Sequence, residues 1–234
     1  MRERDVIIAC DFSTKEETLN FLDLFKEEKP YVKIGQELFY SEGPSIVHEI
    51  KRRGHKIFLD LKQHDIPNTV YKAIKNLAAL GTDMLNVHAA GTIEMMAAAQ
   101  KAVNEINPNI KLIAVTQLTS TSEEKMKEEL WIDHSINDTV VHYAKNAEKA
   151  GLAGVVSSPL EAGLIREACS ENFITVTPGI RFNDATKGDQ VRVTTPAQAR
   201  EIGSDYIVVG RPITGAENPV EAYRRCVREF VKGE

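Results

Sequence analysis

The strongest constraint on the fold is a repeated alternation of short apolar runs with segments of helical periodicity. It occurs eight times along the 234 residues, and no low-complexity tract or interdomain linker interrupts it. Such alternation favours parallel strands joined by right-handed crossovers. A chain of this length therefore predicts an α/β fold, a (β/α)8 TIM barrel forming a single domain over residues 1–234. The expected strands are residues 6–10, 31–34, 56–61, 84–87, 112–115, 154–156, 174–177 and 206–209.

Capping residues indicate where the helices begin. Ser13 with Glu16 three positions later predicts a capping box for the first helix. Later helices are expected at residues 44–53, 67–81, 92–105 and 136–150, and from residues 158, 195 and 218 onward; a short insertion at about 121–135 is expected to hold a helix at 123–130. A doubly wound open sheet is the alternative fold, but it predicts a glycine-rich first turn, and residues 11–13 contain no glycine.

Polar residues fall at or just past the ends of the apolar runs. In a barrel these ends form one face, where active sites lie. Lys33 is the most informative because it stands inside an apolar run, which scattered loop polarity does not explain. The polar residues concerned are Asp11, Lys33, Asp60, Lys62, His88, Thr119, Ser157 and Arg211.

Residues 57–69 carry the most telling group of charges. Asp60 and Lys62 are two positions apart in the third run, so they share one face, and Asp65 falls in the loop beyond. Burying charge is costly unless it is paired, which favours a functional site here. A structural ion pair, or a strand end that runs into solvent, is the alternative.

The loops after the seventh and eighth runs predict a phosphate site, as is common in barrels. Glycine lets backbone N–H groups approach an anion, and arginine offers a bidentate fork for phosphate oxygens. Gly179, Gly210 and Arg211 are assigned to the phosphate, with Arg181 and Gln190 nearby. The loop at about 178–195 is long enough to cover a ligand, although a plain surface loop is the alternative.

Composition excludes several classes of protein. The net charge of −5, without a basic stripe, gives no sign of nucleic-acid binding. The N-terminal segment matches neither a signal peptide nor a membrane span. Three widely spaced cysteines, Cys10, Cys169 and Cys226, predict free thiols in a cytoplasmic protein. No metal or dinucleotide motif appears, so neither a metal nor a cofactor is expected.

The histidines and the single tryptophan are expected to play minor parts. His88 is interpreted as a hydrogen-bonding wall of the site. Trp131 is interpreted as a packing residue. The histidines expected to face solvent are His48, His55, His134 and His142.

Six segments together resemble the orotidine 5′-phosphate decarboxylase family in its compact bacterial form. They are residues 11–13, 32–35, 58–69, 117–120, 177–181 and 209–213, and they keep the family's order along nearly the whole chain. The resemblance implies conversion of orotidine 5′-phosphate to UMP without a cofactor, as the last step of pyrimidine nucleotide synthesis. It also implies a homodimer in which Asp65 and Thr69 complete the site of the partner subunit.

The resemblance further implies a role for each residue. Lys62 protonates C6 of the pyrimidine within a network of Lys33, Asp60, Lys62 and Asp65. Lys33 and Asp11 contact the ribose, and Thr119 and Ser120 read the pyrimidine edge. The substrate-binding set is Asp11, Lys33, Asp60, Thr69, Thr119, Ser120, Pro178, Gly179, Arg181, Gln190, Gly210 and Arg211.

Two other readings remain open. Sibling barrels that share the Asp-x-Lys-x-x-Asp triplet, such as 3-keto-gulonate 6-phosphate decarboxylase and hexulose 6-phosphate synthase, use Mg²⁺ and an enediolate intermediate. A nucleotide-binding barrel that has lost catalysis is the rival from another class. The continuation at residues 64–69 and the segment 177–181 favour the pyrimidine enzyme.

Overall fold

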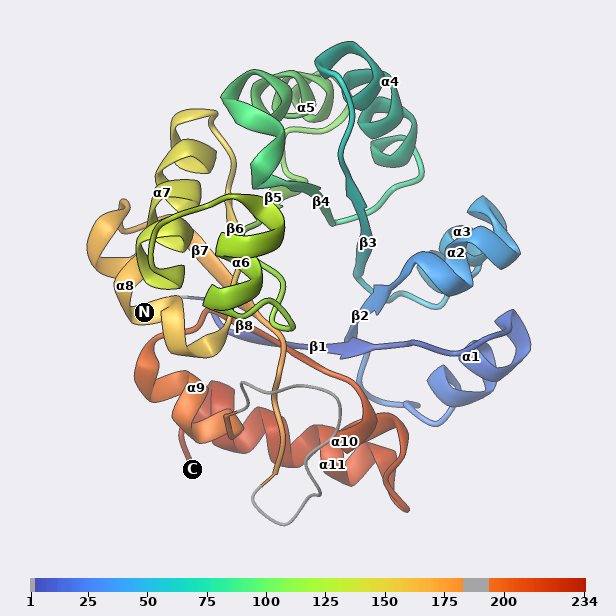
Figure 1. Ribbon diagram of the computed structural model, residues 1–234. Helices are drawn as coiled ribbons and strands as arrows, with labels where there is room; N and C mark the ends of the chain where they lie inside the picture. The colour runs from blue at the N-terminus through green and yellow to red at the C-terminus, as the bar shows by residue number, and fades with distance from the viewer. Residues whose placement is uncertain (1–2, 183–193) are drawn as a thin grey trace.

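The computed structural model, which describes residues 3–182 and 194–234, is a closed barrel of eight parallel strands (Figure 1). Each strand pairs with the next one along the chain, and β1 pairs with β8 to close the ring. The strands are β1 (Asp5–Ala9), β2 (Tyr31–Ile34), β3 (Ile57–Gln63), β4 (Met84–His88), β5 (Lys111–Val115), β6 (Gly154–Val156), β7 (Ile174–Thr177) and β8 (Tyr206–Val209). The predicted barrel is therefore confirmed, and β2, β6, β7 and β8 have the predicted bounds.

The helices lie outside the ring of strands (Figure 1). They are α1 (Lys15–Leu22), α2 (Gln36–Glu42), α3 (Pro44–Arg52), α4 (Pro67–Ala78), α5 (Thr92–Ile106), α6 (Glu123–Leu130), α7 (Ile136–Lys149), α8 (Ala162–Ala168), α9 (Pro196–Ile202), α10 (Arg211–Thr214) and α11 (Pro219–Cys226). Short 3₁₀ turns occur at Ala89–Gly91 and Pro159–Glu161, and a π-helical segment, Val227–Lys232, follows α11.

Alternation along the strands separates two cores. In β3, Phe58 belongs to a cluster inside the barrel with Tyr31 and Tyr206, whereas Leu59 belongs to the larger cluster between strands and helices. Because side chains alternate in a strand, Asp60 returns to the inner side two residues after Phe58. The apolar inner cluster thus fills the barrel below the level at which the charged side chains begin.

The capping signals were correct at three helices and wrong at one. Side-chain caps are present at Ser158, Thr195 and Asn218, and the first two form complete capping boxes. At α1 the cap is Thr14, whose hydroxyl accepts from the backbone N–H of Glu17, so the predicted box at Ser13 is wrong. The hydroxyl of Ser13 instead donates to a carboxylate of α2, Glu37.

Two short helices were not predicted from the sequence. They are α2 and α10, of seven and four residues, and both begin after a glycine that makes no side-chain cap. Residues 211–213 were expected to be loop, and they form the start of α10 instead.

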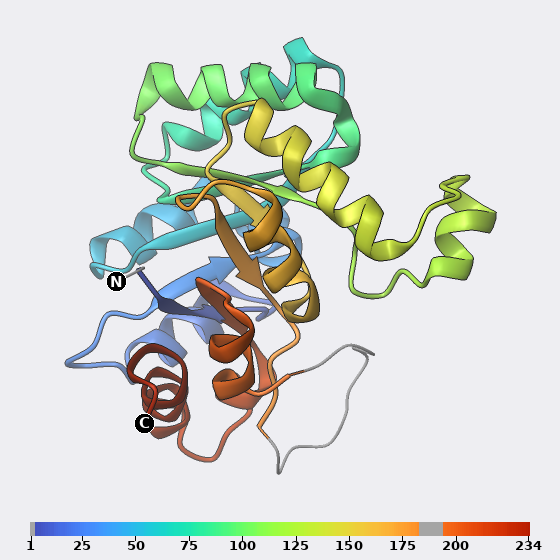
Figure 2. The same ribbon diagram turned by 90° about the vertical axis from the view of Figure 1, so that its left-hand side faces the viewer.

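Two minor interpretations are also corrected. His55 is buried, with 2% of its surface exposed, because its ring packs against the chain at Pro30 and bonds to that residue's carbonyl oxygen. Trp131 is 90% exposed and therefore packs against little of its own chain. It follows α6 directly, and Figure 2 shows α6 standing out from the barrel on the side away from the N-terminus.

None of the helices in residues 3–182 and 194–234 has the length and apolar character needed to span a membrane.

Candidate active site

Two adjoining cavities open among residues at and beyond the carboxyl ends of the strands. They share Lys33, Pro178 and Val208, so they form one continuous site. The first, about 230 Å³, is lined by Lys33, Phe58, Asp60, Lys62, Val115, Gln117, Leu118, Thr119, Val156, Ser157, Pro178 and Val208. The second, about 350 Å³, is lined by Ala9, Asp11, Lys33, Pro178, Gly179, Arg181, Val208, Gly210 and Arg211.

A chain of alternating charges crosses the floor of this site. The Lys33 ammonium lies 2.8 Å from Asp11 and 3.6 Å from Asp60, and the Lys62 ammonium lies 2.7 Å from Asp60. The side chains of Lys33 and Asp60 are only 12% and 11% exposed, so the centre of the chain is largely withdrawn from water. The residues come from β2, β3 and the end of β1, which the parallel barrel brings to one face.

Burial and neighbouring charge oppose each other in this network. Burial raises the pKa of Asp60, but Lys33 and Lys62, with hydrogen bonds from Lys62 and Asn86, outweigh it and hold that pKa below its ordinary value. Burial likewise lowers the pKa of Lys33, and Asp60 and Asp11 outweigh it, so the pKa is raised. Both groups are therefore ionised at neutral pH.

Lys62 adopts an uncommon backbone conformation. Its φ angle is +51°, in the left-handed region that side chains other than glycine seldom enter. The pairing of β3 with β4 is irregular at the same point, between Leu59 and Gln63. Asp60 and Lys62 were expected on one face of a regular strand; their side chains do meet, but the strand is irregular between them.

Asn86 completes the floor of the site and was not identified from the sequence. It lies in β4 with 2% of its surface exposed, and it contacts both Asp60 and Lys62. The sequence does show a polar side chain, the amide of Asn86, inside an otherwise apolar run. A polar side chain in such a run is also what identified Lys33. Gln117, which lines the first cavity, was also missed as a site residue.

The second cavity brings together the groups assigned to a phosphate. Gly179, Arg181, Gly210 and Arg211 all line it. Gly179 has φ +85°, which explains why glycine stands there. The backbone N–H of Arg181 donates to the Thr194 carbonyl, and that of Thr194 donates to the Gly179 carbonyl. Gln190 lies outside the described residues.

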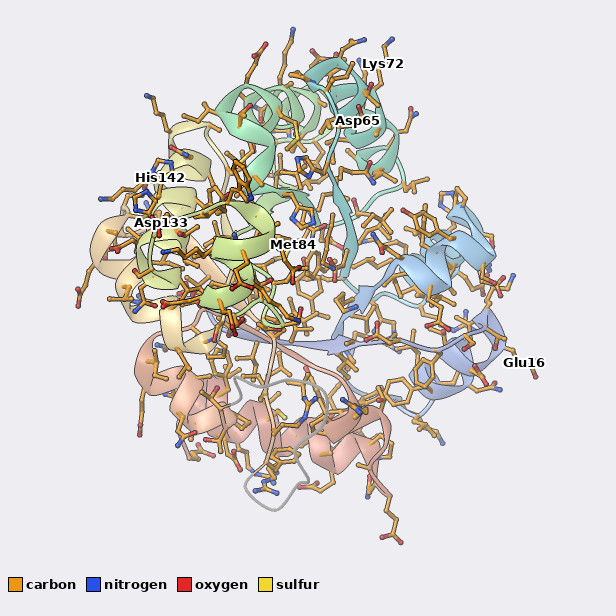
Figure 3. All side chains as sticks on the ribbon, viewed as in Figure 1. Glu16, Asp65, Lys72, Met84, Asp133 and His142 are labelled. Atoms are coloured by element: carbon orange, nitrogen blue, oxygen red, sulfur yellow. The ribbon has the colours of Figure 1, made fainter. Side chains whose placement is uncertain are left out.

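Some predicted site residues do not meet the others within one chain. Thr119 lines the first cavity, but Ser120 is exposed and does not. Asp65 and Thr69 are exposed at the start of α4. Among the described residues, the Asp65 carboxylate accepts from the neighbouring Ile66 N–H and forms no ion pair with Lys62. Figure 3 shows Asp65 beside α4, away from the centre of the barrel.

His88 lies at the edge of the site, with its ring 5.6 Å from that of His64. Burial lowers the pKa of His88, and the charges of His64 and Lys62 act in the same direction. His88 is therefore a neutral ring at pH 7, but it lines neither cavity, so its role as a wall of the site stays a prediction. In the described part of the chain, no group of three or more histidine, cysteine, aspartate and glutamate side chains has a geometry suited to a metal ion.

Comparison with known proteins places the chain among relatives of one kind. A family model described as the orotidine 5′-phosphate decarboxylase / HUMPS family matches residues 4–226. The chain is 56% identical over 232 residues to an orotidine 5′-phosphate decarboxylase of Fusobacterium nucleatum, covering 99% of this chain and 98% of that protein. It is 55% identical over 225 residues to one from Staphylococcus aureus, covering 96% and 97%.

Solved structures agree with the sequence comparison. The crystal structure of orotidine 5′-phosphate decarboxylase from Lactobacillus acidophilus superposes with a TM-score of 0.88 at 39% identity, covering 97% of this chain and 99% of the other. The family model spans nearly all of the described barrel, including every strand. The chain therefore belongs to the orotidine 5′-phosphate decarboxylase / HUMPS family.

Proposed function

We propose that this protein decarboxylates orotidine 5′-phosphate to UMP without a cofactor. The observation that carries the proposal is the buried network of Lys33, Asp60 and Lys62 beside a second cavity that presents two arginines. The first cavity suits a flat ring next to an ammonium, and the second suits a phosphate. The names of the 56% and 55% identical relatives support this substrate over others.

The chemistry assigned to Lys62 is proton transfer to carbon. The bond between C6 and the carboxyl carbon breaks, CO2 leaves, and the bonding electron pair remains on C6. The ammonium of Lys62 stabilises that charge and donates a proton to C6, which gives UMP. Lys62 then regains a proton from solvent. Asp60, 2.7 Å from the Lys62 nitrogen, orients the ammonium.

Binding of the rest of the substrate falls to the other residues. Lys33 and Asp11 contact the ribose, and Thr119 with Ser120 contacts the pyrimidine edge. Arginines hold phosphate through bidentate, charge-assisted hydrogen bonds, which is the role of Arg211 and Arg181. Energy from this remote contact can be used to position the reacting ring. Gln190 and the covering loop at about 178–195 remain part of the proposal.

A homodimer would supply the second carboxylate of the site. Asp65 and Thr69 are exposed, and neither lines the cavities of its own chain. Ile66, between them, is 67% exposed and adds apolar surface to the same segment. These observations support a dimer in which Asp65 and Thr69 reach the site of the partner subunit.

The wider setting follows from the same proposal. UMP formation would be the last step of pyrimidine nucleotide synthesis. Cys10, Cys169 and Cys226 are all free thiols, which favours a reducing compartment such as the cytoplasm.

A spectroscopic assay tests the function directly. The long-wavelength edge of the orotidine 5′-phosphate absorbance should decrease on conversion to UMP, whose ring absorbs at shorter wavelength, at the same rate with and without a chelator. Lys62→Ala should lower turnover by more than about 10⁴-fold, because one residue supplies both the proton and charge stabilisation, while UMP still binds measurably.

Lys111→Ala is the matched control. Lys111 begins β5, pairs with Glu3 at 3.7 Å, and lies away from both cavities, so its variant should keep near-normal turnover. Near-normal decarboxylation by Lys62→Ala would refute the role given to Lys62. Absence of turnover with orotidine 5′-phosphate, or turnover that is lost on chelation, would favour the magnesium-dependent sugar-phosphate siblings.

A further inference from the structure

The strand that carries Lys62 departs from its neighbour just where the charges gather. Leu59 pairs with Leu85 and Gln63 pairs with Val87, so three residues of β3 stand opposite a single residue of β4. That single residue is Asn86. A bulge of this kind leaves backbone groups of the longer strand without their ladder partners and redirects side chains.

The Asn86 side chain takes the place of the missing ladder partner. The backbone N–H of Lys62 donates to Asn86 Oδ1 at 2.8 Å. Asn86 Nδ2 donates to Asp60 Oδ1 at 2.6 Å, and the Lys62 ammonium donates to the same Asp60 oxygen at 2.7 Å. One amide therefore ties the backbone of Lys62 to the carboxylate that receives its ammonium.

The chemistry of the partners fixes which way this amide faces. A backbone N–H can only donate, so the atom facing Lys62 is the amide oxygen. An ionised carboxylate can only accept, so the atom facing Asp60 is the amide nitrogen. An ionised aspartate could not donate to Asp60, and serine is too short to span both partners. The position needs a side chain with one acceptor and one donor at this separation.

We propose that Asn86 is a positioning residue for the Lys62 ammonium. It holds Lys62 at its positive φ angle and fixes the carboxylate oxygen at which the ammonium is aimed. The inference rests on the proposed function, because it treats Lys62 as the proton donor. Errors of about 1 Å in the placement of a reacting group can cost ~10²-fold in rate. Loss of Asn86 should therefore act on turnover rather than on ligand binding.

Asn86→Ser is the first test. It removes both hydrogen bonds, and we expect kcat to fall by about 10- to 100-fold. The KM for orotidine 5′-phosphate and the affinity for UMP should stay within about threefold, because the phosphate cavity is lined by other residues. Thr116→Val is the matched control: Thr116 is equally buried, bonds to the Val156 carbonyl, and lines neither cavity.

Asn86→Asp gives a second, independent readout. It keeps the shape and the acceptor for Lys62, but it sets a second carboxylate against Asp60. Two adjacent carboxylates share a proton at low pH, which restores the donor, and repel each other once both ionise. Its kcat relative to wild type should therefore fall as pH rises. Other charged groups face the same place and contribute to this pH dependence. They are Lys33 on β2, Asp60 and Lys62 on β3, which act on each other, and His88 on β4.

Two outcomes would overturn the proposal. One is a kcat for Asn86→Ser as high as that of Thr116→Val, and the other is an Asn86→Asp pH profile parallel to that of wild type. Crystal structures of both variants provide a separate measure, in which the Lys62 ammonium should move off Asp60 in Asn86→Ser. That displacement can be seen whether or not the wild type decarboxylates orotidine 5′-phosphate, so failure of the proposed function and of this inference can be told apart.

Discussion

At the scale of single residues, Asp60 is the residue whose substitution should disturb the charged network most. It receives Lys62 and Asn86 at one carboxylate oxygen and Lys33 at the other. Removing one partner of a buried ion pair typically costs about 3–5 kcal/mol, because the remaining charge is left without compensation. That cost measures the charge left unpaired and is not a net gain in stability from the network. The burial of these charges is therefore better explained by the proposed chemistry.

A buried histidine away from the site makes the stability of the fold depend on pH. His55 Nδ1 bonds to the Pro30 carbonyl, so it carries the proton, and Nε2 has no hydrogen-bond partner among the described residues. Burial lowers the pKa of His55, with Lys29 and Arg53 acting in the same direction. Below the unfolded-state pKa of about 6.5 the unfolded chain binds more protons than the folded chain, so stability is lost as pH falls.

Urea unfolding at pH 7.5 and pH 5.5 tests this expectation. The free energy of unfolding should be smaller at pH 5.5, and His55→Gln should shrink the difference between the two pH values. His88, whose pKa is also lowered, should account for part of the pH dependence that remains in His55→Gln. His134→Gln, at an exposed histidine, is the control and should leave the difference unchanged. An equal pH dependence in wild type and His55→Gln would contradict the assignment.

A charge in an apolar context was the sequence signal that pointed to side chains which the structure brings together. Lys33, Asp60 and Lys62 could be identified because buried charges are rare without a reason. Asn86 also stands in an apolar run, but it was missed because an uncharged amide is a weaker signal than a charge. The positive φ angle of Lys62 could not be predicted, because it arises from pairing between β3 and β4 rather than from local sequence. The burial of His55 likewise depends on tertiary contacts.

At the scale of elements, side-chain caps and helix length together decided which helices the sequence could show. The helices that begin after Ser158, Thr195 and Asn218 carry caps that satisfy backbone N–H groups, and the sequence shows them. The helices α2 and α10 have only seven and four residues and no side-chain cap, whereas α3 and α5, which also follow glycines without a side-chain cap, are longer and were predicted. The few turns of α2 and α10 are stabilised by packing, so neither composition nor periodicity could show them.

Close strand packing leads to a prediction about two glycines. In β6, Gly154 pairs with Ile174 of β7, and a Cβ at Gly154 would collide with the Ile174 carbonyl and side chain. Gly154→Ala should destabilise the fold by at least about 1–3 kcal/mol.

A glycine in a helix is the matched comparison. In α8, a Cβ at Gly163 would meet its nearest neighbour, the Ile202 carbonyl oxygen, at an ordinary 3.5 Å. Gly163→Ala should therefore stabilise by roughly 0.5–1 kcal/mol, through helix propensity.

The midpoints of urea unfolding for the two variants should move in opposite directions from wild type. Because the substitution is the same in both, a general effect of adding a methyl group cannot produce opposite signs. A higher midpoint for Gly154→Ala would contradict the close packing of β6 on β7, and a lower midpoint for Gly163→Ala would contradict the space described beside α8.

At the scale of the whole molecule, barrel closure gathers residues that are far apart in sequence. Asp11 follows β1 and Arg211 follows β8, yet both line one cavity. This gathering was predictable, because the carboxyl ends of all parallel strands in a barrel meet at one face. Whether a second chain completes the site was not predictable in the same way, since that depends on surfaces rather than on chain connectivity. Asp65 and Thr69 are therefore the residues whose roles most need a test.

Mixing two inactive variants can decide which chain supplies Asp65. If Asp65 acts in the site of the partner subunit, a mixed dimer of Lys62→Ala and Asp65→Ala has one site with both residues native. Random mixing should then restore about one quarter of the wild-type sites, because half of the dimers of a two-fold assembly are mixed and each has one native site in two. If Asp65 acts within its own chain, no site becomes native.

The control mixture is Lys62→Ala with Asp60→Ala. These residues lie in one chain and contact each other at 2.7 Å, so every site in that mixed dimer lacks one of them and activity should stay absent. Recovery in the first mixture alone would assign Asp65 to the partner subunit. Recovery in neither would remove Asp65 from the shared site.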